Sequence, residues 1–175
     1  QLSDIMRIPI KKAGKVIESY KNVYPGIFQY MEFIEKFIRK NKYAYSIFGR
    51  RRNLPDIDSK NFAVASKAVR QGINFTIQST ASDILVCSLI GISEKLEERG
   101  MKTRIVSTVH DSLEIISPED ELDEACSIIY DEMVNYPYIK KHFGISFDVP
   151  LEIEILVGDS FGDGEEYFVE SINDN

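Results

Sequence analysis

Residues 104–116 read RIVSTVHDSLEII, two runs rich in Ile, Val and Leu that are separated by a few polar residues. Runs of this composition favour strands, and so short a separation is typical of an antiparallel hairpin. We therefore predict strands over residues 104–109 and 113–116, with His110, Asp111 and Ser112 at or near the tip of the hairpin.

Helical patterns lie upstream of this hairpin. Apolar residues recur at three- and four-residue intervals over residues 25–40, which predicts an amphipathic helix that Pro25 opens. A shorter helix is expected over residues 9–20. Residues 43–48 alternate in a way that predicts a short strand, and residues 50–53 are predicted to form an exposed turn.

The sequence from residue 61 onward predicts a mixture of helices and strands. Residues 61–99 have a helical pattern, but Gly72, Asn74 and Thr76 are poor interior residues, so two helices with a break over residues 73–76 are expected, and Gly100 is a natural stop. Ser117 and Pro118 predict the N-cap and first residue of a helix that reaches about Asn135, and residues 149–157 predict a strand. The fold class is α+β, with helices packed on one side of a small antiparallel sheet.

Composition limits the class of protein. The 175 residues are 43% hydrophobic, which is enough for a real core, and no apolar run approaches the roughly 18 residues that cross a bilayer. We expect a soluble, intracellular chain without a membrane partner. Cys87 and Cys126 lack Cys-x-x-Cys spacing and are interpreted as buried thiols in a reducing compartment.

Charge is distributed unevenly along the chain. The net charge is −7, yet residues 1–110 carry 19 Lys and Arg against 10 Asp and Glu, whereas residues 111–175 carry 2 against 18. Residues 36–52 hold seven cations, no acid and four aromatic residues. A solvated helix face and a phosphate-binding surface both explain such a window, and the aromatic residues add weight to the second.

A carboxylate at a hairpin tip is well suited to hold a divalent metal. Two strands fix the side chain while the turn leaves it open, and Mg²⁺ usually takes only one or two protein carboxylates together with water and phosphate. Asp111 fits this role. Taken alone, however, Asp is a common turn residue, and turn chemistry is then the simpler explanation for both His110 and Asp111.

Four motifs, taken together in their order, favour the metal hypothesis. They are Tyr24-Pro25-Gly26; Gly49-Arg50-Arg51 with Leu54-Pro55-Asp56; Arg70, Asn74 and Gln78 with Thr80-Ala81 and Asp83-Ile84; and Val109-His110-Asp111. In this order and spacing the chain resembles the C-terminal half of family A DNA polymerases. The resemblance runs over residues 1–163, the expected fingers and palm portion, and leaves residues 164–175 as an acidic, mobile tail.

The resemblance implies template-directed transfer of dNTPs to the 3′-hydroxyl of a primer by two Mg²⁺ ions. It makes Asp111 one of two metal-binding aspartates and places His110 near the primer terminus. It also implies that Arg50 and Arg51 contact the DNA backbone. The residues that it places at the minor groove of the primer–template are Arg70, Asn74 and Gln78, three donors spaced four apart, which without the resemblance would read as a solvated helix face.

Two features depart from the family pattern. Ser112 stands where the family commonly has Glu, and the family's other aspartate motif, Asp-x-Ser-x-x-Glu, and its nucleotide-binding helix do not occur in these residues. We therefore expect one part of a longer or split polymerase, inactive alone, whose N-terminal portion is supplied in cis or in trans. The alternative is a degenerate palm that binds DNA or a partner without catalysis. A stand-alone phosphohydrolase that uses Asp111 would need several clustered acids or His ligands, and the chain has only His110 and His142 as histidines.

Overall fold

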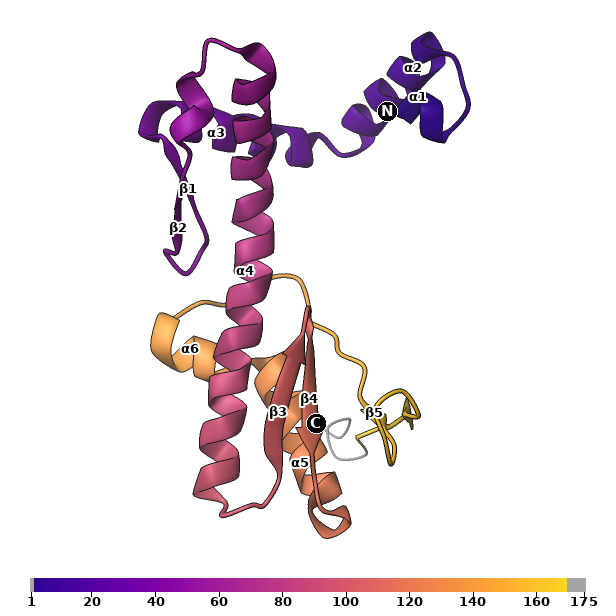
Figure 1. Cartoon of the computed structure of the whole chain (residues 1–175), viewed down its shortest axis with the longest axis vertical. Helices are drawn as coiled ribbons and strands as arrows, with labels where there is room; N and C mark the ends of the chain where they lie inside the picture. The colour runs from indigo at the N-terminus through magenta and orange to yellow at the C-terminus, as the bar shows by residue number, and fades with distance from the viewer. Residues whose placement is uncertain (1, 170–175) are drawn as a thin grey trace. The chain divides into compact units, whose positions relative to one another are not determined.

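The computed structural model describes residues 2–169 and divides into two compact units, with the division between Ser79 and Thr80 inside one long helix (Figure 1). The elements of the first unit are α1 (Leu2–Ile5), α2 (Ile10–Val23), α3 (Pro25–Asn41), β1 (Tyr43–Tyr45), β2 (Arg51–Asn53), the 3₁₀ helix η1 (Pro55–Asp58) and the start of α4 (Phe62–Glu98). The second unit contains the rest of α4, then β3 (Arg104–Val109), β4 (Ser112–Ile116), the 3₁₀ helix η2 (Glu119–Glu121), α5 (Leu122–Tyr130), a π-helical segment η3 (Asp131–Asn135), α6 (Pro137–Phe143), β5 (Leu156–Val157) and β6 (Glu165–Glu166).

The α+β class predicted from the sequence is confirmed. Helices dominate, and the described strands pair as three antiparallel two-stranded sheets, β1 with β2, β3 with β4 and β5 with β6. The predicted helix over residues 25–40 is confirmed as α3, with Pro25 in its first turn. The helix expected over residues 9–20 is confirmed as α2, although Pro9 lies just before it as the N-cap.

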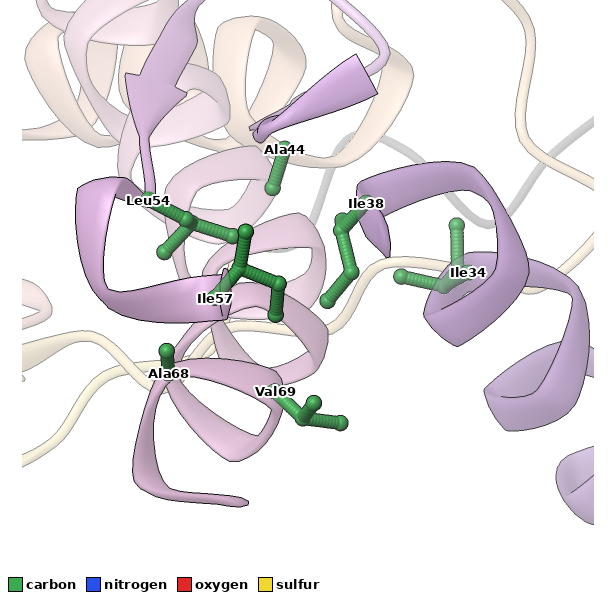
Figure 2. Packing of buried hydrophobic residues seen from close by; sticks show 7 residues of the cluster. All are labelled: Ile34, Ile38, Ala44, Leu54, Ile57, Ala68 and Val69. Atoms are coloured by element: carbon green, nitrogen blue, oxygen red, sulfur yellow. The ribbon is translucent and has the colours of Figure 1, made fainter. Parts of the chain in front are cut away.

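The core of the first unit lies where α3 and α4 meet the short elements between them (Figure 2). Ile34 and Ile38 face it because they are four residues apart on α3 and therefore lie on the same side of the helix. The remaining buried members are Ala44 of β1, Leu54, Ile57 of η1, and Ala68 and Val69 of α4. This cluster fixes the position of α4 relative to α3 within the unit.

The predicted turn over residues 50–53 is wrong, because residues 51–53 form strand β2. Tyr45 pairs with Arg51 and Tyr43 with Asn53, so the turn lies earlier, where Gly49 has a φ of +83° and donates to the carbonyl of Ser46. The strand predicted over residues 43–48 is confined to β1, which ends at Tyr45. All three side chains of β2 are exposed, so this strand has no alternating apolar pattern by which it could be predicted.

The predicted break near residues 73–76 is also absent, and α4 runs without interruption for 37 residues. Gly72 faces the core so closely that a Cβ there would lie 2.7 Å from Leu54 Cδ1 and 2.8 Å from Ile38 Cδ1. Thr76 is buried and its hydroxyl is hydrogen-bonded within the protein. Tertiary contacts therefore override the weak helix propensity of these residues.

The second unit is built on the predicted hairpin, which is confirmed as β3 and β4 (Figure 1). Ile105 and Leu113 on one face of this sheet pack against Ile92 and Leu96 of α4 and Ile128 of α5. These apolar contacts anchor the hairpin on α4 and α5.

The connection from α4 to β3 is held by main-chain and side-chain hydrogen bonds. Gly100, the predicted stop, has a φ of +65°, and Met101 donates its N–H to the carbonyl of Leu96 at 3.0 Å. The carboxylate of Glu121 accepts the N–H groups of Lys102 and Thr103, at 2.9 and 2.8 Å. The hydrogen bond from Lys102 is the main cause that lowers the pKa of Glu121 below its ordinary value, and that from the Thr103 hydroxyl adds to it.

A buried ion pair joins α4 to η3. The side chain of Glu132 is 3% exposed, and its Oε1 lies 2.9 Å from Lys95 Nζ, which also lies 2.7 Å from Asp131 Oδ2. Burial opposes the charge on Lys95, but hydrogen bonds to Asp131 and Glu132 outweigh it and raise the pKa of Lys95. Burial likewise opposes ionisation of Asp131, but the hydrogen bonds from Lys95 and Asn135, together with the charges of Lys95 and Lys140, outweigh it and lower the pKa of this carboxyl.

Further expectations for the second unit need correction. Ser117 does not cap a helix: its hydroxyl bonds Thr103 Oγ1 and the carbonyl of Pro118, and a 3₁₀ turn begins the helical region. The strand predicted over residues 149–157 is confined to β5. Within the predicted acidic tail, residues 165–166 form β6, and residues 170–175 of that tail lie outside the described part of the chain.

Two remaining expectations concern cysteine and the membrane. Cys87 and Cys126 are buried thiols, as predicted, and burial raises the pKa of Cys126. An 18-residue stretch of α4 has a mean hydropathy of 1.4, so by length and composition alone this helix is long and apolar enough to cross a membrane. The core helix of a soluble protein meets the same criteria, and α4 contributes Ala68 and Val69 to the core of the first unit and Ile92 and Leu96 to that of the second.

Candidate functional site

The seven residues predicted to carry function fall into two groups. Arg50, Arg51, Arg70, Asn74 and Gln78 belong to the first unit, and His110 and Asp111 belong to the second. All seven side chains are exposed. Each group is therefore open to a ligand within its own unit.

His110 and Asp111 form the two-residue loop of the β3–β4 hairpin. Val109 pairs directly with Ser112, so only these two residues lie between the strands. His110 has a φ of +57°, whereas Asp111 is not among the residues of positive φ, the sign pattern of a type II′ turn. A non-glycine residue in this region is uncommon, although His is enriched there. The strands thus present the Asp111 carboxylate at an exposed tip.

Ser112 and Glu114 lie on the same face of β4 and are in contact. The Ser112 hydroxyl lies 3.0 Å from both the carbonyl oxygen of Val109 and Glu114 Oε1. The opposite strand has an irregularity between Ile105 and Ser107, which leaves Val106 without a partner. Bulges of this kind bend a strand and are frequent next to functional sites.

Asp111 is a single carboxylate rather than part of a ligand cluster. Among residues 2–169, no three His, Cys, Asp or Glu side chains are grouped so that they could hold a metal ion. A hard oxygen donor on a rigid hairpin is nevertheless a suitable ligand for Mg²⁺, which completes its shell with water and phosphate oxygens. A cleft of about 640 Å³ runs along β3 and α4 and is lined by Thr108, but neither His110 nor Asp111 lines it.

The β1–β2 hairpin presents Arg50 and Arg51. The guanidinium carbon of Arg51 lies 3.4 Å from the centroid of the Tyr43 ring, a close cation–π contact on the neighbouring strand. Two hydrogen bonds with Ser46 fix the main chain at Arg50. The Ser46 N–H donates to the Arg50 carbonyl at 2.9 Å, and the Arg50 N–H donates to the Ser46 hydroxyl at 3.2 Å. Tyr43 is not among the residues predicted to carry function, although the aromatic residues interleaved with cations in residues 36–52 could have indicated it.

Two cations of the basic window are paired with acids that lie outside it in sequence. Arg39 bonds Glu35 one turn earlier in α3, at 2.7 Å, and Lys42 forms an ion pair with Asp58. The first unit nevertheless remains basic, because residues 1–79 carry 15 Lys and Arg against 6 Asp and Glu. Its exposed surface therefore favours polyanions.

Arg70, Asn74 and Gln78 follow one another along one exposed face of α4, as their four-residue spacing predicts. The opposite side of the same turns is buried and includes Gly72 and Thr76. The continuous helix therefore holds the three hydrogen-bond donors in one row.

Comparison with known proteins identifies the family. The family model described as DNA polymerase family A matches residues 1–163. The chain belongs to DNA polymerase family A. It is 31% identical to DNA polymerase I of Bacillus caldotenax over 164 residues, which are 94% of this chain and 18% of that protein. It is 33% identical to the DNA polymerase of Bacillus phage SP01 over 159 residues, 91% of this chain and 17% of that protein.

A solved structure supports the same assignment for this family A chain. The POL domain of Pol1 from M. smegmatis, in complex with a DNA primer–template and dNTP, is similar with a TM-score of 0.78 and 30% identity. The similarity covers 86% of this chain and 25% of that chain. The family resemblance stated from the sequence is confirmed, and the chain spans about 18% of the length of the curated relatives that it matches first.

Proposed function

We propose that this chain forms the C-terminal fingers and palm part of a DNA-directed DNA polymerase, which adds dNTPs to a primer 3′-hydroxyl opposite a template. The observation that carries the proposal is the exposed carboxylate of Asp111 at the tip of a two-residue hairpin, in a chain of family A. The primer–template and dNTP named with the M. smegmatis domain support the same substrates.

Asp111 is proposed as a ligand of the Mg²⁺ pair of the complete enzyme. Bound there, Mg²⁺ would lower the pKa of the primer 3′-hydroxyl and neutralise charge on the phosphates. The hairpin holds the carboxylate in place, so little reorganisation is needed when the substrates bind. His110, adjacent in the loop, offers imidazole nitrogens as hydrogen-bonding groups near the primer end.

DNA contacts are proposed for the first unit. Arg50 and Arg51 would bind backbone phosphates, and the stacking of Arg51 on Tyr43 orients its guanidinium while its edge remains able to donate. The row on α4 would donate to the acceptors that every base pair presents in the minor groove, and so test pairing geometry without reading sequence. The members of this row are Arg70, Asn74 and Gln78.

We further propose that the chain acts together with an N-terminal polymerase portion, in cis or in trans, as a soluble intracellular protein. A metal pair needs more carboxylate ligands than Asp111 offers by itself. The described residues provide no further cluster around it. The partner portion would supply the second aspartate and the nucleotide-binding helix.

The test is a primer-extension assay with the chain and a separately produced N-terminal polymerase portion. Asp111→Asn keeps the size of the side chain but removes its charge. Metal ligation contributes several kcal/mol to such transition states, so we expect a loss of activity of about a thousandfold or more. Asp120→Asn, an exposed acid of η2, is the matched control and should leave the rate unchanged. Full activity of Asp111→Asn would refute the metal-binding role.

A second candidate function is a degenerate palm that binds DNA or a partner without catalysis. Ser112 favours it, since its neutral hydroxyl replaces the carboxylate common in the family and is engaged by Val109 and Glu114. The same assay separates the two functions. Synthesis that appears with the N-terminal portion and depends on Asp111 supports the enzyme, whereas DNA binding without any synthesis supports the degenerate module.

A further inference from the structure

The first part of α4 has two opposite faces with different surroundings. Asn74 is exposed, and Thr76, two residues later, is 6% exposed. At about 3.6 residues per turn, two residues correspond to roughly 200° of rotation, so these side chains project from nearly opposite sides of the helix. Whatever fixes the rotation of α4 at Thr76 therefore fixes the direction in which Asn74 points.

Thr76 is held by a directed pair of hydrogen bonds. The Tyr30 hydroxyl of α3 donates to Thr76 Oγ1 at 2.8 Å, and Thr76 Oγ1 donates to the carbonyl of Ile73 at 2.7 Å. The first bond joins residues 46 positions apart in sequence. Because a hydroxyl donates one hydrogen along a defined direction, this contact restricts rotation of α4 about its axis.

The packing beside this contact sets distance rather than rotation. Gly72 allows α4 to approach Leu54 and Ile38, since any Cβ there would come within 2.8 Å of their methyl groups. Apolar contacts of this kind are non-directional and tolerate small rotations. A hydrogen bond weakens steeply as its angle falls, so the bond from Tyr30 discriminates between rotations that the apolar core does not.

We propose that Tyr30 is a positioning residue which, through Thr76, sets the rotation of α4 and so aims the amides of Asn74 and Gln78 at the primer–template minor groove. The inference rests on the DNA-binding role proposed above for the α4 row. A rotation of about 10° moves an atom 6 Å from the helix axis by roughly 1 Å, enough to break a hydrogen bond to a base. Loss of the Tyr30 hydroxyl therefore impairs recognition of pairing geometry and leaves the metal site intact.

The decisive variant is Tyr30→Phe, which removes one hydroxyl and keeps the ring. In the assembled polymerase, we expect discrimination between paired and mispaired primer termini, measured as the ratio of kcat/KM values, to fall about three- to tenfold. The kcat for a paired terminus should stay within about twofold of the wild type. Thr76→Val should give the same loss, and the double variant should be no worse than Thr76→Val alone.

The matched control is Tyr20→Phe. The Tyr20 ring packs on Tyr24 and Phe28, and its hydroxyl makes no hydrogen bond with the residues that the structure describes. This control should retain full discrimination. In the chain alone, the side-chain amide NMR signals of Asn74 and Gln78 should shift in Tyr30→Phe and not in Tyr20→Phe, a readout independent of polymerase activity.

Three outcomes overturn the inference or the function beneath it, and they are distinguishable. If Asn74→Ala leaves DNA affinity and discrimination unchanged, the proposed DNA-binding role of the α4 row fails. If Asn74→Ala lowers discrimination but Tyr30→Phe does not, only the positioning role of Tyr30 fails. If Tyr30→Phe lowers kcat and discrimination together with thermal stability, Tyr30 acts as a general scaffold residue and the inference is overturned.

Discussion

Replacement of Lys95 by Met should strongly destabilise the second unit, because it leaves the buried carboxylate of Glu132 without its ion-pair partner. The Met side chain keeps most of the aliphatic length of Lys and has a similar helix propensity, so the change removes little except the ammonium group. Glu132, whose side chain is 3% exposed, then has only the N–H of Tyr138, at 3.3 Å, as a hydrogen-bond partner of its carboxylate among the described residues. Asp131 is 41% exposed and can be solvated instead.

The magnitude follows from the burial of each partner. Breaking a buried ion pair by removing one charge typically costs about 3–5 kcal/mol. The side chain of Lys95 is 33% exposed, so water reaches the pair, and we expect the lower end, about 3 kcal/mol in the free energy of unfolding. Adding Glu132→Met removes the stranded carboxylate, and the double variant should return to within about 1 kcal/mol of the wild type.

The pH dependence of this effect can also be derived. The pKa of Lys95 is raised above its ordinary value of 10.5, so its contribution is complete below that value and is lost as pH rises through the folded-state pKa. The pKa of Asp131 is lowered from 3.8, so its contribution is complete above 3.8 and is lost as pH falls through the folded-state pKa. The difference between wild type and Lys95→Met should therefore be constant across neutral pH.

The assay is amide hydrogen exchange as a function of urea, followed in peptides of the second half of α4 and of α5. The chain contains no Trp for a fluorescence signal, and exchange separates the two units, which need not unfold together. Lys141→Met, an exposed residue of α6, is the control and should lie within about 0.5 kcal/mol of wild type. A cost below about 1 kcal/mol for Lys95→Met, or no recovery in the double variant, would refute the reasoning.

Two further predictions address the same unit. Gly91→Ala should destabilise it by about 1–2 kcal/mol in urea unfolding, since the new Cβ would lie 2.4 Å from Glu132 Oε2 and the cost of overpacking exceeds the gain in helix propensity. Gly14→Ala, with open space around its Cβ position, should be neutral or slightly stabilising; equal behaviour of both variants would contradict the contact. Glu121→Gln should lower Tm at pH 6, because the carboxylate that accepts the N–H of Lys102 has a lowered pKa and stabilises the fold above its ordinary value of 4.5. This difference should shrink as pH falls below 4.5, and a gap that widens in acid would exclude the assigned role.

The positions of the candidate site residues were accessible to sequence reasoning, and some of their supporting contacts were not. The hairpin around Asp111 follows from two β-rich runs with a short polar connection, and the row of Arg70, Asn74 and Gln78 follows from helical spacing. Ser112 was recognised as a departure, but its hydrogen bond to Glu114 required the structure. Strand β2 was missed because its exposed Arg side chains lack alternation and only its pairing with β1 defines it.

The sequence by itself determined the features that depend on local periodicity and on short motifs: the amphipathic α3, the β3–β4 hairpin with His110 and Asp111 at its tip, and membership of family A. Only the tertiary structure decided whether α4 breaks at Thr76 and which charges are neutralised. Tyr30 contacts Thr76 across 46 positions, and Lys42 meets Asp58 across 16. Contacts between segments distant in the chain leave no periodic signal, yet a part-buried one such as the hydrogen bond from Tyr30 to Thr76 contributes about 1 kcal/mol, enough to override a local propensity of a few tenths of a kcal/mol.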